Sequence, residues 1–473
     1  MLRLRIRFML TFLAGVVVAA AVSGLAASVV NSAQTRYDDL SLFTNVLTLV
    51  RSHYVEPIED GVLIRGAVTG LLSELDPHSS FLDVEQYHEM QVDTRGEFHG
   101  LGIEITKHAD GYIEVIAPIE GTPADRAGIE SRDQIVKICP TVVPENWDEK
   151  CRSTKNMTLI EAVSLMRGKR GTEITIEIFR EGFSEPRPFT VVRDVVQVVS
   201  VSGRMLEPGY AYVRIRSFAE RTDDELHEVL ARLRDESHEP FRGLVIDLRD
   251  NPGGLLDQAV KIADTWLDDG LVVYTEGRNA SQRHEYKARP TGTEPNYPIT
   301  VLVNPGSASA SEIVAGALQD QRRALIIGQQ TFGKGSVQTV YPLEDNHGLR
   351  LTTALYYTPA GRSIQEVGIA PDIVVDPAVV ASIGKARRRI READLEGHFT
   401  QGEASPDAAT EAGEASEQSD SPSTDSDADG NSDRDDVQLT RALEVLKSWN
   451  YFEHLRDAES TPSLQANARG KQP

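Results

Sequence analysis

Two short stretches near residue 310 place a serine and a lysine in settings that favour chemistry. The first is the small-residue turn Asn304-Pro-Gly-Ser-Ala-Ser-Ala-Ser-Glu312, which joins a strand-like run at 299–303 to a run at 313–318 with helical spacing. A hydroxyl in such a turn lies beside the unpaired N–H groups and the positive dipole end of the helix. The turn therefore suits an oxyanion. The alternative is an ordinary helix cap, because Ser309 and Glu312 also fit the capping-box pattern.

The second stretch is Thr331-Phe-Gly-Lys-Gly-Ser336, in which glycines flank Lys334 and allow close backbone approach. A lysine acts as a base only when neutral, so burial or a nearby positive dipole must lower its pKa from about 10.4. If residues 334–341 are extended, the side chains at 334, 336 and 338 share one face. Gln338 is then within reach of the ammonium, and we expect it to orient the base.

Other interpretations of the lysine and histidine residues are weaker. Gly328 and Lys334 have the spacing of a P-loop, but Gly335 stands where a magnesium-binding Ser or Thr is required, and a strand-like run follows. Ser382 and Lys385 match Ser-x-x-Lys without the accompanying boxes of that class. His78 is interpreted as a structural residue.

The runs 303–320 and 328–338 together resemble the carboxyl-terminal processing (tail-specific) proteases, which are serine peptidases. The resemblance implies that Ser309 is the nucleophile, Lys334 the general base and Gln338 its partner, and the offset of 25 positions from serine to lysine matches the family pattern. It further implies a Ser-Lys dyad with an acyl-enzyme intermediate, and no metal or cofactor.

An oxyanion hole needs backbone N–H donors near the serine. We expect one from Ala310, at the helix start, and the other from the glycine turn in 243–254, where an apolar strand runs into Asn-Pro-Gly-Gly. Members of the family carry a similar segment, and Gly253 is favoured over Gly254. An ordinary strand-to-helix turn is the alternative.

Upstream, residues 96–190 resemble a PDZ domain in the circularly permuted form of this family. Alternating strand-like runs surround a helix that Thr158 and Glu161 would begin with a capping box. Such domains bind a peptide as an added strand. The expected peptide-binding residues lie on the carboxylate loop and the groove: Gly100, Leu101, Gly102, Ile103, Ala162 and Met166. The alternative is a packing domain without a ligand.

The N-terminal sequence predicts export. Arg3, Arg5 and Arg7 precede an uncharged stretch from 8 to 34, so residues 1–34 fit a cleaved signal peptide or an uncleaved membrane anchor. Either places the rest of a bacterial chain in the periplasm. The two cysteines, Cys139 and Cys151, bracket an insertion and could form a disulfide there, although free thiols are not excluded.

Charge separates a tail from the folded parts. Of the net charge of −23, residues 401–436 carry −11, from twelve acids and one arginine. Residues 381–436 therefore predict an acidic disordered linker, and the composition excludes nucleic-acid binding. Within it, 425–436 has the carboxylate spacing of a calcium loop, a pattern that an Asp-rich linker also produces. Residues 437–460 predict a C-terminal helix that docks on the core.

We therefore expect a multidomain α/β (α+β) protein: an N-terminal helical segment at 35–95, the inserted PDZ domain, and a crotonase-like, S41-like serine protease core at 191–380. The helical segment would dimerise the protein, cap the core or only pack against it. The expected function is an exported endopeptidase that selects protein substrates by their C-terminal tails, with possible homodimers and inner-membrane association. A PDZ scaffold with an inactive core is the alternative.

Overall fold

The computed structural model describes residues 40–107, 111–143, 147, 149–376, 390–395, 397–399 and 436–460. The chain forms two compact units, Met1–Leu75 and Asp76–Pro473. The expected signal or anchor at 1–34 lies outside the described residues.

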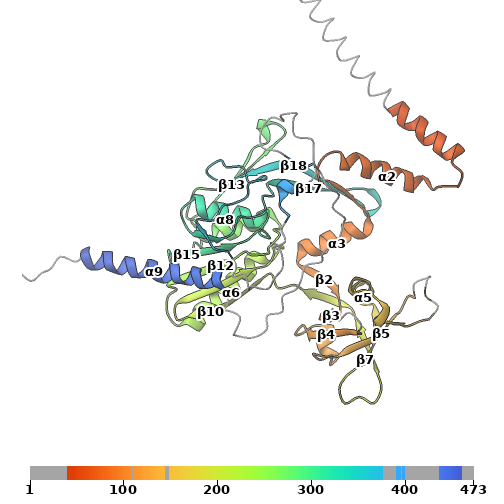
Figure 1. The fold of residues 1–473 in the computed structure, drawn as a ribbon, viewed down its shortest axis with the longest axis horizontal. Coiled ribbons are helices and arrows are strands. Elements are labelled where there is room, and N and C mark those ends of the chain that lie inside the picture. Colours follow the sequence, from red (N-terminus) through yellow and green to blue (C-terminus); the bar gives the residue numbers. More distant parts are fainter. Residues whose placement is uncertain are drawn as a thin grey trace, which may run out of the picture. The chain divides into compact units, whose positions relative to one another are not determined.

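The first unit is helical, as the sequence predicts. Residues 40–53 form one helix and α2 (Asp60–Ser73) forms the next, with Arg51 paired to Asp60 at 3.0 Å (Figure 1). Many of its large apolar side chains are exposed, among them Leu40, Leu42, Phe43, Val46, Leu49 and Leu71. In the part of the chain that the structure describes, no helix is both long and apolar enough to cross a bilayer.

The PDZ region is a small β-rich body with its own core. Its main sheet contains β3 (Ile103–Lys107), β4 (Ile113–Pro118), β5 (Gln134–Pro140), β7 (Glu173–Phe179) and β8 (Arg187–Val192), with β6 (Arg152–Ser153) beside β5. The helices are α4 (Pro123–Arg126) and α5 (Leu159–Met166). The capping box predicted at the start of α5 is confirmed, because Glu161 N–H donates to the Thr158 hydroxyl and Thr158 N–H donates to the Glu161 carboxylate. Cys139 and Cys151 are joined by a disulfide.

Two antiparallel strands, β2 (Glu97–Gly100) and β9 (Asp194–Gln197), pair where the chain enters and leaves the PDZ region. The preceding helix α3 (Val84–Arg95) begins with a capping box between Asp83 and Gln86. Its carboxyl end is tied to the expected protease core, since Glu220 N–H donates to the Thr94 carbonyl.

The region expected to be the protease core is built on a six-stranded sheet in the order β10-β11-β12-β15-β16-β19. Its strands are β10 (Val201–Glu207), β11 (Tyr210–Ile215), β12 (Gly243–Asp247), β15 (Ile299–Val303), β16 (Leu325–Gly328) and β19 (Ile373–Val374). All neighbours except β10 and β11 run parallel. Every residue of β12 and β15 is buried, as expected for parallel strands covered on both faces. Their carboxyl ends share one edge, so the turns that follow them are neighbours.

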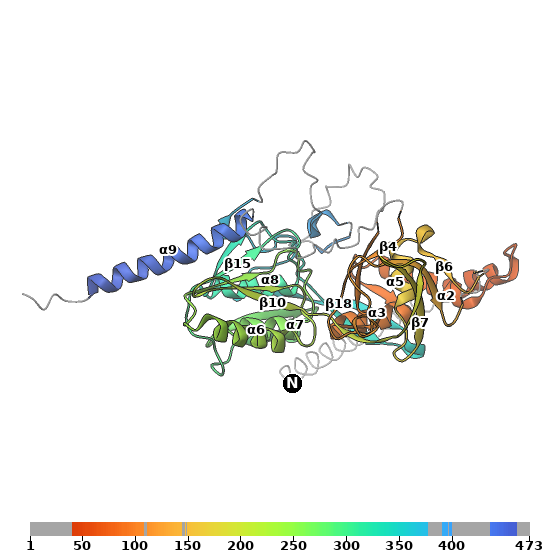
Figure 2. The same cartoon turned by 90° about the horizontal axis from the view of Figure 1, so that it is seen from below.

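Helices cover both faces of this sheet. On one face α6 (Thr222–Ser237), α7 (Leu256–Asp264) and α8 (Ala310–Asp320) contribute buried side chains such as Leu226, Ile262 and Ile313 to the main core. On the other face α9 (Val437–Ser460), the expected C-terminal helix, buries Leu439 and Leu446 against the sheet (Figure 2).

A second sheet carries the lysine segment. It contains β1 (Ser80–Leu82), β18 (Gly348–Tyr357), β13 (Leu271–Gly277) and β14 (His284–Lys287), with β17 (Ser336–Pro342) paired to β18. The predicted run after the lysine is thus a strand. Together with the helical N-terminal segment and the PDZ region, these sheets confirm the mixed α/β multidomain class.

The range 381–436 differs from the expected linker in one stretch. Residues 390–395 and 397–399 pack on the core, with a 3-10 helix at Glu392–Asp394 and Glu392 fully buried. Composition alone does not reveal this, because the burial of Glu392 depends on partners far away in sequence, such as His78. The calcium-like segment lies outside the described residues except for Asp436, which pairs with Arg249 at 2.7 Å.

Candidate active site

Ser309, the expected nucleophile, has a strained backbone conformation. It follows the turn after β15 and has φ 54° and ψ −111°, a conformation rarely adopted by a residue other than glycine. Its N–H donates to the Glu312 carboxylate at 2.8 Å, and its side chain interacts with that of buried Tyr356. Ser309 is therefore fixed at the N-terminus of α8 rather than acting only as its cap.

Neighbouring serines tie this turn to the one after β12. The Ser307 hydroxyl donates to the Leu248 carbonyl at 2.7 Å, and the Ser311 hydroxyl donates to the Asn251 carbonyl at 2.9 Å. Both serines are fully buried. They have structural roles, which leaves Ser309 as the serine that opens into the site.

The glycine turn touches Ser309 directly. A Cβ on Gly253 would lie 2.8 Å from the Ser309 Cβ and 3.0 Å from the Ala310 nitrogen. The Ala310 N–H donates to no oxygen among the described residues, whereas the Gly253 N–H donates to Asn251 Oδ1 at 2.9 Å. The geometry thus brings the two expected oxyanion donors together, with Ala310 available and Gly253 engaged by Asn251.

Glu312 connects the serine turn to the lysine loop 331–335. Besides the Ser309 N–H, its carboxylate accepts hydrogen bonds from Gly333 N–H at 2.8 Å, from Lys334 N–H at 3.0 Å and from the Thr331 hydroxyl at 2.5 Å. Burial raises the pKa of Glu312 to about 7, and these hydrogen bonds act in the opposite direction. One carboxylate therefore sets the position of both expected catalytic residues.

Lys334 lies in an environment that favours its neutral form. Burial and then the positive charge of Arg350 lower the pKa of its amine, while Glu392, Glu312 and Asp76 act to raise it. Among the described residues, no salt bridge pairs its ammonium with a carboxylate. A lysine held in this way can accept a proton near neutral pH more readily than an exposed one.

Gln338 enters the same region, but its hydrogen bonds do not go to the lysine. Its amide nitrogen donates to the Ser336 hydroxyl at 3.0 Å, and Thr352 lies 3.5 Å away. The side chains of Ser336 and Gln338 lie on the same face of β17, as expected from alternation along a strand. The pairing of β17 with β18 shifts register between Val337 and Gln338. The orienting role of Gln338 stays a prediction.

These groups open into one cavity of about 920 Å³. Its lining includes Gly253, Ser309, Lys334, Gln338, Arg350 and Tyr356, together with residues of α3 such as Met90. Ser309 and Lys334 therefore line the same cavity, although they come from different elements of the fold.

The expected peptide-binding residues of the PDZ region are mostly interior. Leu101, Ala162 and Met166 belong to its hydrophobic core and are at most 5% exposed. Gly102 has φ 76°, and a Cβ there would lie 2.3 Å from the Thr122 side chain, so glycine is required. The Gly100–Ile103 segment does lead into β3 beside α5, but the groove assignment stays a prediction.

Sequence reasoning missed three residues around the lysine loop. Glu312 was noticed only as a capping partner, although its place between the two motifs is the signal that could have revealed its bridging role. Gln365 accepts from the Gly335 N–H at 2.9 Å, and Glu392 accepts from the Gln365 amide at 2.9 Å. No spacing in the sequence identifies these two.

Comparison with known proteins gives three family matches. The model for peptidase family S41 matches residues 209–375, the PDZ domain model matches 89–179, and the model for the activating protease CtpB N-terminal domain matches 16–86.

Individual relatives extend these matches over most of the chain. The carboxy-terminal-processing protease of Bartonella bacilliformis is 41% identical over 444 residues, which cover 93% of this chain and 96% of that protein. The carboxyl-terminal-processing protease of Synechocystis is 36% identical over 340 residues, 70% of this chain and 76% of that protein. The solved structure of the photosystem II D1 C-terminal processing protease is 31% identical, covers 71% and 87% of the two chains, and gives a TM-score of 0.42.

The chain is thus a serine-type peptidase that carries a PDZ domain. It belongs to the carboxy-terminal-processing proteases of peptidase family S41, which confirms the resemblance seen in the sequence.

Proposed function

We propose that this peptidase is an exported endopeptidase that selects protein substrates by their C-terminal tails and cleaves them with a Ser309–Lys334 dyad. The observation that carries the proposal is that a strained serine at a helix N-terminus and a lysine with a lowered pKa line one cavity. The backbone N–H groups of both residues donate to the same buried carboxylate, Glu312.

In the proposed mechanism, neutral Lys334 takes the proton of the Ser309 hydroxyl as the serine oxygen attacks the scissile carbonyl. The developing oxyanion binds the Ala310 N–H at the positive end of α8. The N–H of Gly253 joins it if Asn251 releases that group when substrate binds. Lys334 then gives the proton to the leaving amine, and water hydrolyses the acyl-enzyme on Ser309 by the same route.

The PDZ region would capture the substrate before cleavage. PDZ domains bind an extended C-terminus as an added strand, with backbone N–H groups holding the carboxylate. In this chain the Gly100–Ile103 segment and the edge of β3 beside α5 are the expected binding elements. Unstructured tails would be preferred, because only they can add to a sheet edge and then reach the cavity.

We further propose that the protein acts in the periplasm, exported by residues 1–34 as a cleaved signal or an uncleaved inner-membrane anchor. The N-terminal arginines and the uncharged run support export, and the Cys139–Cys151 disulfide suits an oxidising compartment. Exposed apolar residues at 40–71 and in α9, such as Trp449, support homodimers through the terminal segments. Light scattering on the purified chain tests the dimer.

The decisive comparison uses the wild-type chain with Ser309→Ala and Lys334→Ala. The substrate is a folded protein with an unstructured apolar C-terminal tail, and the same protein without the tail is its control. Lys287→Ala, which removes an exposed lysine of β14, is the matched control variant. We expect loss of cleavage in both site variants, wild-type cleavage in the control variant, and slower cleavage without the tail. Cleavage that survives Ser309→Ala or Lys334→Ala would rule out the dyad.

A further inference from the structure

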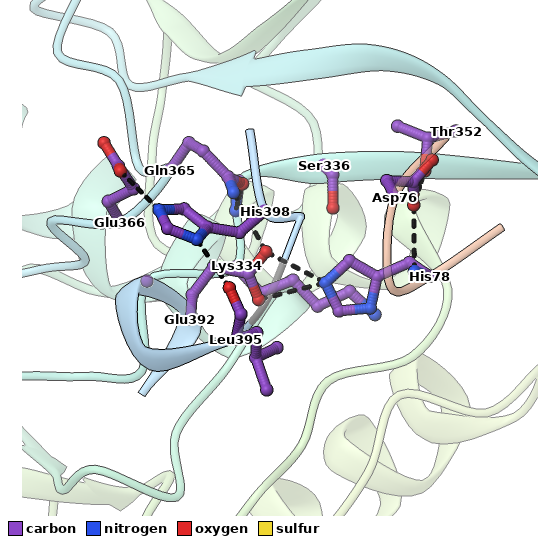
Figure 3. Close-up of polar contacts among 12 residues, drawn as sticks. Asp76, His78, Lys334, Ser336, Thr352, Gln365, Glu366, Glu392, Leu395 and His398 are labelled. Atoms are coloured by element: carbon purple, nitrogen blue, oxygen red, sulfur yellow. Dashed lines mark hydrogen bonds and ion pairs between the residues drawn. The ribbon is translucent and has the colours of Figure 1, made fainter. Parts of the chain in front are cut away.

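A short segment C-terminal to the protease core, residues 391–395 and 397–398, packs against the lysine loop. It lies between the last core strand, β19, and the C-terminal helix α9, in a part of the sequence with the composition of a linker. Figure 3 shows its Glu392 and His398 side chains turned toward the residues that surround Lys334. Burying a carboxylate costs free energy unless the group is paired and hydrogen-bonded. The buried Glu392 next to the expected general base therefore needs a physical explanation.

Glu392 holds both ends of the lysine loop. On one side, its backbone N–H donates to the Phe332 carbonyl at 3.3 Å. On the other side, its carboxylate accepts from the Gln365 amide at 2.9 Å, and the oxygen of that same amide accepts from the Gly335 N–H at 2.9 Å. Lys334 lies between the two points that are held.

The carboxylate of Glu392 also ties in the N-terminal part of the second unit. His78 Nε2 lies 2.9 Å from each of the two Glu392 oxygens (Figure 3). His78 is itself fixed, because its N–H donates to Asp76 and its carbonyl accepts from Arg350. Three segments that are far apart in sequence therefore meet at one buried carboxylate.

The rest of the segment grips the loop that backs the lysine. The Arg391 guanidinium donates to the carbonyls of Glu366 and Val367 at 3.2 and 3.0 Å, and His398 Nε2 lies 2.7 Å from the Glu366 carboxylate. Glu366 N–H in turn donates to the Gly333 carbonyl at 2.8 Å. Glu392 is thus anchored on a surface that is continuous with the lysine loop.

The charges around the lysine show what the carboxylate contributes. The groups that act on Lys334 are Arg350 from β18, Glu312 from α8, Asp76 from the turn before β1, and Glu392 from the segment, which His78 contacts. Burial acts to raise the pKa of Glu392, but hydrogen bonds from His78 and Gln365 outweigh it and leave this pKa below its ordinary value. Glu392 is therefore a persistent negative charge near the amine.

We propose that Glu392 is a positioning residue for Lys334: it holds the lysine loop at both ends and faces the amine with a fixed negative charge. The proposal rests on the function proposed above, in which Lys334 is the general base. When the amine accepts the Ser309 proton it becomes an ammonium, and a preorganised carboxylate stabilises the charge that forms in that step. The same charge raises the pKa of Lys334, so a smaller fraction of the lysine is neutral before the reaction. In return, the amine is held in position, and the ammonium that forms during the reaction is stabilised.

The test is the pH profile of kcat/KM for Glu392→Gln on a fluorogenic peptide, with each value normalised to the active serines titrated by a fluorophosphonate. Removing the negative charge lowers the pKa of Lys334, so the acid limb moves to lower pH. The plateau kcat falls roughly tenfold to a hundredfold, because the loop loses a charged anchor and the ammonium loses its partner. KM stays within about twofold, since Glu392 does not line the cavity.

Two further variants separate positioning from simple damage to the fold. The exchange Gln365→Glu with Glu392→Gln reverses the amide and the carboxylate but keeps a chain of hydrogen bonds from Gly335 to His78. We expect it to restore most of the plateau and return the acid limb toward the wild-type position. Asp394→Asn removes an acid from the same 3-10 helix, where its carboxylate accepts from the Arg391 N–H, and should leave kcat within about twofold.

The outcomes distinguish this proposal from the one on which it rests. If Lys334→Ala keeps its activity, both fall. If Lys334→Ala is inactive but Glu392→Gln retains a wild-type plateau and acid limb per active serine, the dyad stands and the role of Glu392 is wrong. The proposal is also overturned if Glu392→Gln lowers the plateau kcat without moving the acid limb, and the Gln365→Glu/Glu392→Gln exchange does not restore that plateau. Such a result would show that Glu392 has a purely structural role.

Discussion

Replacing Gly253 by alanine should disable catalysis through a single added methyl group. The new Cβ would lie 2.8 Å from the Ala308 oxygen, 2.8 Å from the Ser309 Cβ and 3.0 Å from the Ala310 nitrogen. Because carbon atoms in contact prefer a separation of about 3.5 Å or more, the serine turn or the glycine turn must move by roughly 0.7 Å. Both turns carry groups that have to meet the reacting carbonyl.

The size of the effect follows from that displacement. A misplacement of about 1 Å can reduce a rate by about a hundredfold, so we expect kcat for Gly253→Ala to fall by roughly ten- to a hundredfold. This corresponds to about 1.4–2.7 kcal/mol in activation free energy. KM should change little. The backbone φ of 105° adds about 1–3 kcal/mol of strain in folding, because a residue with a Cβ rarely adopts it.

The assay is steady-state cleavage of a fluorogenic peptide, normalised to titrated active serines, with unfolding followed in parallel. Gly292→Ala is the matched control, because Gly292 also has a positive φ, 83°, but an added Cβ there meets nothing within 4 Å. It should show the strain in its stability and leave kcat unchanged. The reasoning is refuted if Gly253→Ala keeps kcat within twofold, or if both variants lose the same activity.

Two other predictions concern buried charges. Arg350→Gln removes the positive charge that helps to lower the pKa of Lys334, so the acid limb of kcat/KM should move to higher pH. This shift is opposite to the one expected for Glu392→Gln, and an acid limb that does not move would contradict the prediction. Arg249→Met should reduce the free energy of unfolding by about 3–5 kcal/mol, because it removes the ion pair of fully buried Asp247 and the ion pair of Asp436 at the start of α9. Chemical denaturation measures this change, and an unchanged midpoint would contradict the prediction.

Local sequence patterns were enough to predict many elements of the fold. The strand at 299–303, the turn after it and the helix from Ala310 were visible because apolar periodicity changes from a strand pattern to a helix pattern across small residues. The capping box of α5 and the strand after Lys334 were visible for the same reason. Their signals depend only on neighbours in the sequence.

The site was visible only in part, because its residues depend on long-range contacts. The two motifs indicated Ser309 and Lys334, but the buried interactions between Glu392, Gln365 and His78 join segments up to 314 residues apart. The composition of 381–436 predicted a linker that includes Glu392. No local feature of the sequence distinguishes a buried, hydrogen-bonded carboxylate from an exposed one. The same limit applies to Ala162 and Met166: their helical spacing does not reveal that both are buried in the PDZ core, and their place in the peptide groove stays a prediction.

The central claim is that a neutral Lys334 activates Ser309, and the rate of covalent labelling tests it most directly. A fluorophosphonate is added to the wild-type chain and to Lys334→Ala across a range of pH, and mass spectrometry identifies the labelled residue. We expect labelling of Ser309, at a rate that rises with loss of one proton at a pH below the usual lysine range of about 10.4, and almost none in Lys334→Ala. Labelling at another residue, or an equal rate in Lys334→Ala, would contradict it.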